Sequence, residues 1–380
     1  MATFQKVKFG DLIEQKIKVE IKKGFEYSFV PMENIEPGLK YPRIAETKVF
    51  NGSGSKFADG DTLFARITPC LQNKKIAKVK DLKNGVGFGS TEFFILRAKK
   101  DRANSDYVHY VARLDDLIDT AISSMVGASG RQRADIKSIL EFEINVPDLP
   151  TQTRITSVLS TYDDLIENNE KRIKTLEEMA SRLYTEWFVK FKFPSHEKVE
   201  MIDSGTEFGM IPEGWEVKSL SDEIELGYGK ALKKEDRIPG KVLVCGSGGI
   251  VGTHNDKLVS GPGIVIGRKG NAGAVFWVNS DFYPIDTAFF VKTKLDLAFA
   301  FYLLKSQNFV LGDAAVPGLN RDQAYRNKIL IPDSVLIEGF SKKAGPIRKL
   351  IGQIAAENFN LSQTLDLLIP QLVTGRRELK

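Results

Sequence analysis

Residues 151–190 read TQTRITSVLSTYDDLIENNEKRIKTLEEMASRLYTEWFVK, a stretch of forty residues without glycine or proline. Apolar side chains recur in it at alternating spacings of four and three residues, which predicts a helix with a narrow apolar stripe. At 1.5 Å per residue this helix spans about 60 Å, and Pro194 lies just beyond it. Such a stripe is typical of a helix that pairs with a second helix. Its apolar positions are Ile155, Leu159, Tyr162, Ile166, Ile173, Leu176, Ala180, Leu183 and Trp187.

A second stripe follows near the C-terminus, 185 residues later. Each stripe is interrupted once by an asparagine, Asn169 or Asn358, so we predict an antiparallel coiled coil in which the two asparagines meet in one polar layer and hydrogen-bond as a matched pair. The alternative is that both amides reach solvent at the edge of the stripe. Pro346 predicts a kink or a restart of the second helix. The apolar positions of the second stripe are Phe340, Ala344, Ile347, Ile351, Ile354, Leu361, Leu365, Leu368 and Leu372.

The remainder of the chain is also duplicated, because five short segments recur in the same order. Residues 4–11, 61–66, 91–95, 129–133 and 146–148 match residues 215–222, 263–268, 287–291, 317–321 and 331–333. This alignment places Arg66 opposite Arg268 and Arg133 opposite Arg321. The duplication predicts a pseudo-two-fold internal repeat of two globular domains, each followed by a long helix. The predicted boundaries are 1–150, 151–193, 194–333 and 334–380.

Short apolar segments within the globular parts predict an α+β fold. We expect strands at 62–67, 93–96, 264–266 and 288–291, and helices near 107–122 and 297–305, with glycine-rich turns between them.

The charge is mildly positive and unevenly distributed. The chain has 380 residues, with 54 Lys and Arg against 49 Asp and Glu, a net charge of +5. Residues 1–150 carry 24 basic and 20 acidic side chains and residues 226–333 carry 14 and 9, whereas residues 197–225 hold nine acids and two lysines. Two mildly basic domains separated by an acidic segment are compatible with phosphate binding but do not establish it.

Several classes of protein are disfavoured by what the sequence lacks. The N-terminus has no signal-peptide core and no apolar run is long enough for a membrane span, so we expect a cytoplasmic protein. The two cysteines and three histidines have no metal-ligand spacing. The glycine-rich residues 246–252 lack the lysine and hydroxyl ending of a nucleotide-binding loop, and no methyltransferase, helicase or nuclease motif is evident. We therefore predict no catalytic residue, no metal and no cofactor in this chain.

Loops rich in arginine, lysine, asparagine and glutamine follow the duplicated strands and are the candidate DNA-binding sites. Arginine and lysine bind guanine edges or phosphates, and asparagine and glutamine read adenine. The alternatives are an ordinary solvated loop after Arg66 and after Arg268, and a plain turn at residues 127–133 and 317–321. The predicted DNA-binding residues are Arg66, Thr68, Gln72, Asn73, Lys74, Arg131, Gln132, Arg133, Lys230, Lys233, Arg268, Lys269, Asn271, Asn320 and Arg321.

The end of the first long helix carries an aromatic pair, Trp187 and Phe188, which we expect to be exposed. With Tyr184 and Leu372 it is the predicted docking site for a partner protein or the adjoining domain. Packing in a core is the alternative.

The chain resembles the specificity (S) subunits of type I restriction-modification systems over nearly its whole length. The resemblance rests on the order domain, helix, domain, helix and on four segments. These are Pro150 to Gln152 with Ile155, Leu159, Asp163 and Ile166; residues 183–188; residues 211–217; and residues 367–375.

The resemblance implies that each globular domain reads one half of a bipartite DNA target while the paired helices fix the spacer between the halves. It also implies two methyltransferase subunits, which bind S-adenosylmethionine and methylate adenine, and restriction-translocase subunits that join them. The alternatives are a specificity subunit of a methylation-only or phage-defence complex without a nuclease, and a coiled-coil scaffold with no role on DNA.

Overall fold

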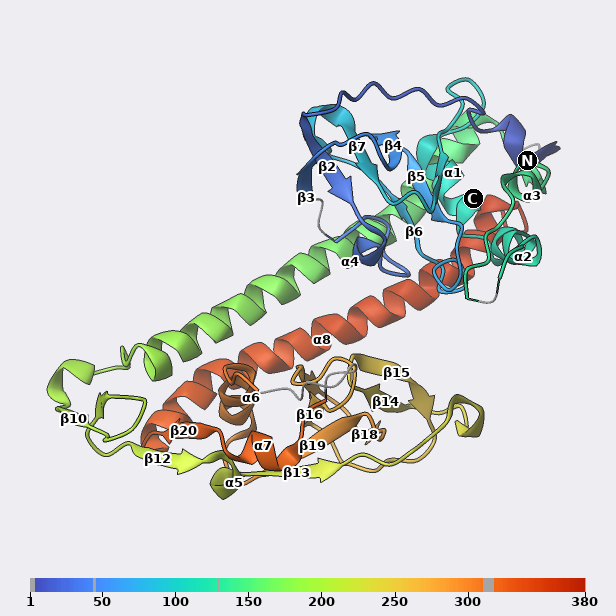
Figure 1. Cartoon of the computed structure of the whole chain (residues 1–380). Coiled ribbons are helices and arrows are strands. Elements are labelled where there is room, and N and C mark those ends of the chain that lie inside the picture. The colour runs from blue at the N-terminus through green and yellow to red at the C-terminus, as the bar shows by residue number, and fades with distance from the viewer. Residues whose placement is uncertain (1–3, 44–45, 129, 310–317, 380) are drawn as a thin grey trace. The chain divides into compact units, whose positions relative to one another are not determined.

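The computed structural model describes residues 4–43, 46–128, 130–309 and 318–379. Ser129 and Pro317, which belong to the predicted loops, lie outside the described residues. The chain divides into a first unit, Met1–Lys171 with Ala356–Lys380, and a second unit, Arg172–Ala355. Two long helices, α4 (Leu149–Tyr184) and α8 (Ser334–Val373), contribute residues to both units (Figure 1).

Among the described residues, the first unit has three small sheets and, besides its parts of α4 and α8, three short α-helices. One sheet pairs β1 (Gln5–Lys8) with β9 (Glu143–Val146). The second has the order β3-β2-β7-β4, formed by Glu46–Val49, Glu26–Val30, Val86–Gly89 and Ser55–Ala58. The third has the order β6-β5-β8, formed by Ile76–Lys78, Thr62–Ala65 and Phe93–Leu96. The helices are α1 (Ser105–Ala112), α2 (Asp115–Ser123) and α3 (Ile136–Leu140).

The second unit has a closely similar set of elements. Two two-stranded sheets pair β10 (Met201–Asp203) with β11 (Met210–Pro212) and β12 (Glu216–Ser219) with β20 (Lys328–Ile331). A four-stranded sheet has the order β13-β19-β16-β17, formed by Ile224–Tyr228, Ala288–Thr293, Gly263–Gly267 and Val275–Val278. A three-stranded sheet has the order β15-β14-β18, formed by Gly249–His254, Val242–Gly246 and Phe282–Pro284. The helices are α5 (Leu220–Glu223), α6 (Leu297–Lys305) and α7 (Arg321–Tyr325).

Strand pairing confirms the predicted internal repeat. The pair β1·β9 corresponds to β12·β20, and the antiparallel pair β5·β8 corresponds to β16·β19. Within the described residues each unit also has one parallel pair, β2·β7 in the first and β14·β18 in the second. Strands β5 and β16 are buried along their whole length, which explains why both read as continuous apolar runs. The predicted α+β class is confirmed in both copies.

The two units also place an equivalent helix against the central strand. Helix α1 is capped by Asn104, whose side chain accepts hydrogen bonds from the second and third backbone N–H groups of the helix. Helix α6 is capped by Asp296 in the same manner. This shared cap aligns the two helices residue by residue, so that His109 corresponds to Phe301.

Buried polar side chains fasten the start of α4 to the first unit. The Gln152 side chain is 1% exposed; it accepts a hydrogen bond from the backbone N–H of Asn104 and donates to two backbone carbonyls. Further along α4, Asp163 accepts a hydrogen bond from the Tyr110 hydroxyl at 2.5 Å and forms an ion pair with Arg113 at 3.3 Å. Because buried polar groups are costly unless they are paired, these contacts fix the helix against the domain.

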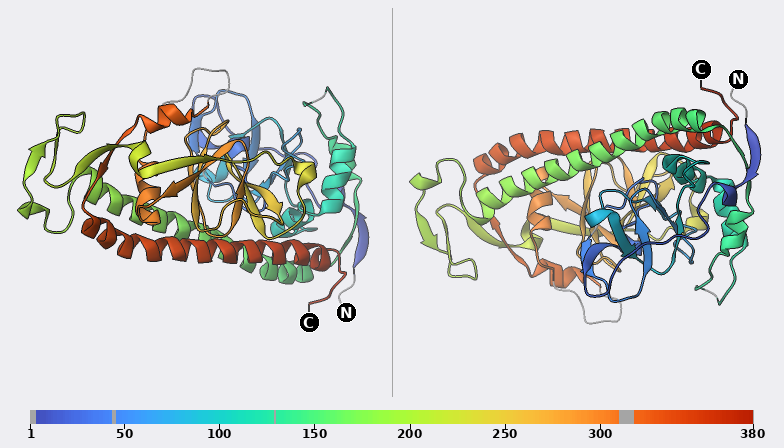
Figure 2. Two further views of the ribbon diagram at one scale, coloured as in Figure 1. Left: turned by 90° about the horizontal axis from the view of Figure 1, so that it is seen from below. Right: turned by 90° about the horizontal axis from the view of Figure 1, so that it is seen from above.

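Within each unit, the parts of α4 and α8 that belong to it lie side by side and run antiparallel (Figure 2). In the first unit the Asn169 amide donates to Glu357 at 3.3 Å, and the Asn358 amide donates to Glu170 at 3.2 Å. Each buried asparagine therefore contacts the glutamate beside the other one, so both belong to one polar layer. In the second unit Arg348 of α8 pairs with Glu177 of α4 at 3.3 Å.

Two sequence predictions for helices are wrong in detail. The helix expected near 107–122 is two helices, because the chain is extended at Leu114 between α1 and α2. Helix α8 is one continuous element through Pro346, so of the predicted kink or restart the restart is wrong. Proline removes only one backbone hydrogen bond, and the neighbouring Phe340 and Ala344 are fully buried in the core of the second unit, which offsets that loss.

Among the described residues, no helix combines the length and apolar composition that a membrane span requires.

Candidate nucleic-acid interface

Two arginines of the first unit converge on one carboxylate at the end of the central strand β5. Arg66 directly follows this strand, and its Nε donates to Glu92 at 3.2 Å. Arg133 reaches the same carboxylate with three hydrogen bonds, the shortest at 2.6 Å. The side chains of Arg66 and Arg133 are 34% and 46% exposed, so the paired guanidinium groups remain accessible.

Electrostatics keeps Glu92 ionised in this cluster. Hydrogen bonds from Arg133 are the largest cause, followed by those from Arg66, and together they hold the pKa of the Glu92 carboxyl below its usual value. The cluster therefore carries one net positive charge and presents two planar guanidinium groups of restricted orientation.

Two arginines also converge in the second unit, but they share an aromatic ring. Arg268 directly follows the central strand β16, and its guanidinium lies 5.0 Å from the centre of the Tyr228 ring. The guanidinium of Arg321, the first residue of α7, lies 4.9 Å from the same ring. Tyr228 is 46% exposed. No carboxylate pairs with either arginine among the residues that the structure describes, so this cluster has two net positive charges.

The structure corrects two details of the sequence alignment between the copies. Ala65 pairs with Phe93, and the equivalent Gly267 pairs with Ala288. Glu92, which precedes Phe93, therefore corresponds to Thr287. The sequence alignment places Thr91 opposite Thr287, which is one residue out of register. A shift of one residue reverses the faces of a strand, and short apolar runs look alike in either register.

The second correction concerns Arg133 and Arg321, which are not equivalent. Asp135 caps α3 and Asn320 caps α7, so Arg133 corresponds to Gly318. The backbone bridges from Ile67 to Arg133 and from Lys269 to Gly318 agree with this assignment. The second arginine of each pair therefore comes from a different position in each copy.

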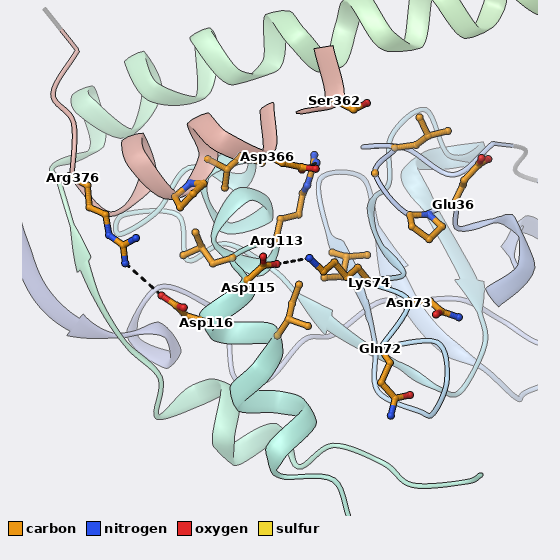
Figure 3. A pocket seen from close by; sticks show the side chains of 18 residues that line it. Glu36, Gln72, Asn73, Lys74, Arg113, Asp115, Asp116, Ser362, Asp366 and Arg376 are labelled. Carbon is orange, nitrogen blue, oxygen red and sulfur yellow. Dashed lines mark hydrogen bonds and ion pairs between the residues drawn. The ribbon is translucent and has the colours of Figure 1, made fainter. Parts of the chain in front are cut away.

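The polar residues that follow Arg66 do not all join the arginine cluster. Gln72, Asn73 and Lys74 line a pocket of about 710 Å³ within the first unit, and Lys74 pairs with Asp115 at 2.6 Å (Figure 3). Across the pocket Arg376 pairs with Asp116 at 3.6 Å. Gln72 and Asn73 are exposed and able to bind a ligand, whereas the Lys74 ammonium already has a partner.

The remaining predicted residues lie in loops of both units. The backbone N–H of Thr68 donates to the carbonyl of Gln132 at 3.0 Å, which ties the loop after β5 to the loop that holds exposed Arg131. Gly127 has a positive φ and follows Val126, whose backbone exchanges two hydrogen bonds with that of Arg133.

In the second unit the Asn320 side-chain oxygen is occupied by its capping bonds, so only its amide NH₂ remains to donate. The other predicted residues of this unit are exposed: Lys230, Lys233, Lys269 and Asn271.

The predicted partner-docking residues are buried, and the expectation that the aromatic pair is exposed is wrong. Trp187 and Phe188 are 7% and 5% exposed in the core of the second unit, where Tyr184 joins them. Leu372 is 3% exposed in the core of the first unit. The ring of Phe188 packs 5.0 Å from Phe299 of α6, because the helix ends where the domain begins and its stripe continues into the domain core.

Sequence reasoning missed Glu92 and Tyr228. Glu92 directly precedes strand β8 and Tyr228 ends strand β13, and nothing in the sequence around them suggests a binding site. Only the fold brings them next to the arginines. Among the described residues, no three histidine, cysteine, aspartate or glutamate side chains gather closely enough to hold a metal ion.

Comparison with known proteins identifies the family. Residues 1–178 and 212–334 match the model of the type I restriction modification DNA specificity domain. The chain is 30% identical to the EcoAI specificity subunit of Escherichia coli over 165 residues, which are 42% of this chain and 28% of that protein. It is 26% identical to the MjaIX specificity subunit of Methanocaldococcus jannaschii over 305 residues, 73% of this chain and 70% of the relative. The matched stretch spans little more than a quarter of the E. coli relative.

A solved structure shows the same fold. The S subunit of a type I restriction-modification system from M. genitalium superposes with a TM-score of 0.53 at 15% identity, covering 100% of this chain and 97% of that one. Two copies of one α+β domain, paired helices and the family model over most of the chain agree with one another. This chain belongs to the specificity subunit family of type I restriction-modification systems.

Proposed function

We propose that this chain is the non-catalytic DNA-recognition subunit of a type I restriction-modification complex. Each globular domain reads one half of a bipartite double-stranded target. The observation that carries the proposal is a pair of arginines beside the end of the equivalent central strand in both copies of the fold, accessible in the first unit and half-buried in the second. Arginine is the side chain best suited to bind guanine edges and phosphates, and two such clusters on one duplicated chain match a divided target.

The paired helices supply the spacing between the two readers. Their polar layer and their ion pair restrict sliding, since a displaced register separates Asn169 from Glu357 and Arg348 from Glu177. In this proposal the helices also carry two methyltransferase subunits, which supply S-adenosylmethionine and methylate adenine in each half-site. Restriction-translocase subunits join that assembly. A complex that only methylates DNA uses the same chain without the nuclease.

The direct test is selection from a random double-stranded DNA library by the chain in complex with a type I methyltransferase subunit. We expect a two-part motif with a spacer of fixed length, and binding that weakens steeply as salt rises. Binding without any sequence preference would leave a scaffold as the better explanation. The genes beside this one distinguish a restricting complex from a methylation-only complex.

A further inference from the structure

The two arginine clusters occupy equivalent ends of the fold, yet the groups that orient the arginines differ. In the first unit Glu92 accepts hydrogen bonds from both guanidinium groups. At the corresponding position the second unit has Thr287, whose hydroxyl accepts a hydrogen bond from the backbone N–H of Ser247 instead. There the Arg268 guanidinium donates to the backbone carbonyl of Asp286 at 3.0 Å, and the exposed ring of Tyr228 lies about 5 Å from both Arg268 and Arg321. A ring under the first arginine is common to both copies, Phe94 under Arg66 and Phe289 under Arg268, so the difference between the clusters is Glu92 in one and Tyr228 in the other.

We infer that Glu92 and Tyr228 are positioning residues that make the two half-sites chemically different to read. The inference rests on the proposed function and deepens it. Glu92 fixes the planes of Arg66 and Arg133 and cancels one of their charges, which favours bidentate bonds to a guanine edge over bonds to any phosphate. Tyr228 restrains Arg268 and Arg321 by contact with its ring face and cancels no charge.

Different electrostatics follow from the two arrangements. The Glu92 cluster has one net positive charge, so the first half-site gains little from phosphate attraction and depends on donor geometry. The Tyr228 cluster has two, so recognition of the second half-site combines base contacts with phosphate contacts and weakens more steeply with salt. One chain therefore reads its two half-sites with different dependence on ionic strength.

Neither residue holds its unit together. Glu92 and Tyr228 lie outside the buried hydrophobic clusters of the described residues, and Tyr228 is 46% exposed. The bidentate pair of Glu92 with Arg133 contributes more to stability than an isolated surface pair, so the unfolding temperature of the Glu92 variant is the control for folding. Substitutions at both positions leave the cores intact, so an effect on recognition is separable from an effect on folding.

The experiment compares full-length variants, each in complex with the methyltransferase, on the random DNA library and on one unrelated duplex. Glu92→Gln removes the charge and keeps the shape. Its matched control is Glu26→Gln. Glu26 begins strand β2 of the same unit, and this substitution weakens its exposed ion pair with Lys83. Tyr228→Leu removes the ring, and Tyr228→Phe keeps it and serves as the rescue. The unfolding temperature of each variant is measured alongside.

For Glu92→Gln we expect discrimination at one guanine-containing pair of the first half-site to fall about tenfold. Affinity for the unrelated duplex rises, because one negative charge is lost beside the DNA. A merely structural role lowers both quantities together. Tyr228→Leu relaxes only the second half-site, and Tyr228→Phe and Glu26→Gln behave as the wild type.

Two results separate the possible failures. A selective wild type whose motif is unchanged in Glu92→Gln and Tyr228→Leu overturns this inference and leaves the proposed function standing. A wild type without any sequence preference overturns both. Relaxation of both half-sites by either single variant also contradicts the separate roles given to Glu92 and Tyr228.

Discussion

Arg66 and Arg268 each directly follow the central strand of one globular domain, so the same substitution tests each domain separately. Arg66→Ala removes one guanidinium from the Glu92 cluster and Arg268→Ala removes one from the Tyr228 ring. We expect each variant to weaken or relax recognition in one half-site only, by roughly 1–3 kcal/mol if the arginine makes a bidentate contact to a base. Selection from the random library measures both half-sites at once. If both variants keep the wild-type motif and affinity, these arginines serve packing or solvation alone.

His109 gives the first unit a pH dependence that the second unit lacks at the equivalent position. Its ring is fully buried, and neither ring nitrogen has a hydrogen-bond partner among the described residues. Burial, assisted by the positive charge of Arg113, holds the pKa of His109 well below its usual value of 6.5. The folded chain therefore keeps this ring neutral where the unfolded chain binds a proton. The contribution of His109 to stability is complete above pH 6.5 and is lost as the pH falls toward the lowered pKa.

His109→Phe places in the first unit the residue that the second unit has at the equivalent position, Phe301. It removes the loss of folding stability that His109 causes at low pH. Below pH 6.5 we expect the variant to gain on the wild type by about 1.4 kcal/mol for each pH unit, until the lowered pKa is reached. Urea unfolding of both proteins at pH 7.5 and pH 5.5 measures the difference, in which the other titrating groups cancel. Equal pH dependence of the two proteins would show that the ring is protonated or solvated in the fold.

At the scale of residues, sequence identifies donors but not their partners. The positions of Arg66 and Arg268 after apolar strands are visible in the sequence, and both lie where that pattern predicts. Glu92 and Tyr228 are brought to them by strand pairing over long sequence distances, which composition does not encode. The burial of Trp187 and Phe188 was misjudged because a helical stripe looks the same against a helix as against a domain core.

The polar layer of the paired helices is the element that sets their register. Asn358 is 8% exposed and its side-chain oxygen has no hydrogen-bond partner among the described residues, so this layer costs stability. We expect Asn169→Leu combined with Asn358→Leu to keep or raise the unfolding temperature while broadening the range of spacer lengths that are bound. Libraries with fixed half-sites and variable spacers measure that range. An unfolding temperature well below that of the wild type, or a spacer preference as narrow, would argue against a register role.

At the scale of elements, periodicity was the most reliable signal. The alternating spacing of four and three residues located both long helices, because it persists over many turns and few other structures produce it. At Pro346 the periodicity was the better guide, because the apolar stripe continues through the proline as the helix does, whereas the proline alone predicted an interruption. The prediction of a single helix near 107–122 was wrong because both of its halves are amphipathic helices. Only the extended backbone at Leu114 separates them, and the apolar pattern does not reveal that break.

For the whole molecule, recognition without reaction predicts a sharp biochemical division of labour. The purified chain alone is expected neither to methylate nor to cut DNA, because its candidate site offers donors to DNA and no reacting group. Incubation with duplex DNA, labelled S-adenosylmethionine, Mg²⁺ and ATP tests this. Robust methyl transfer or cleavage by the chain alone would require a catalytic site that the proposed function does not contain.

The central claim is that each copy of the domain reads one half of the target independently. The most direct measurement maps methylated adenines across the genome of a host that carries the methyltransferase with either this chain or a chimaera. In the chimaera, residues 1–150 are replaced by the equivalent domain of a relative. We predict a two-part motif in both strains, with one half changed, the other half identical and the spacer length retained. A chimaera that changes both halves, or neither, while remaining folded and assembled would contradict the account.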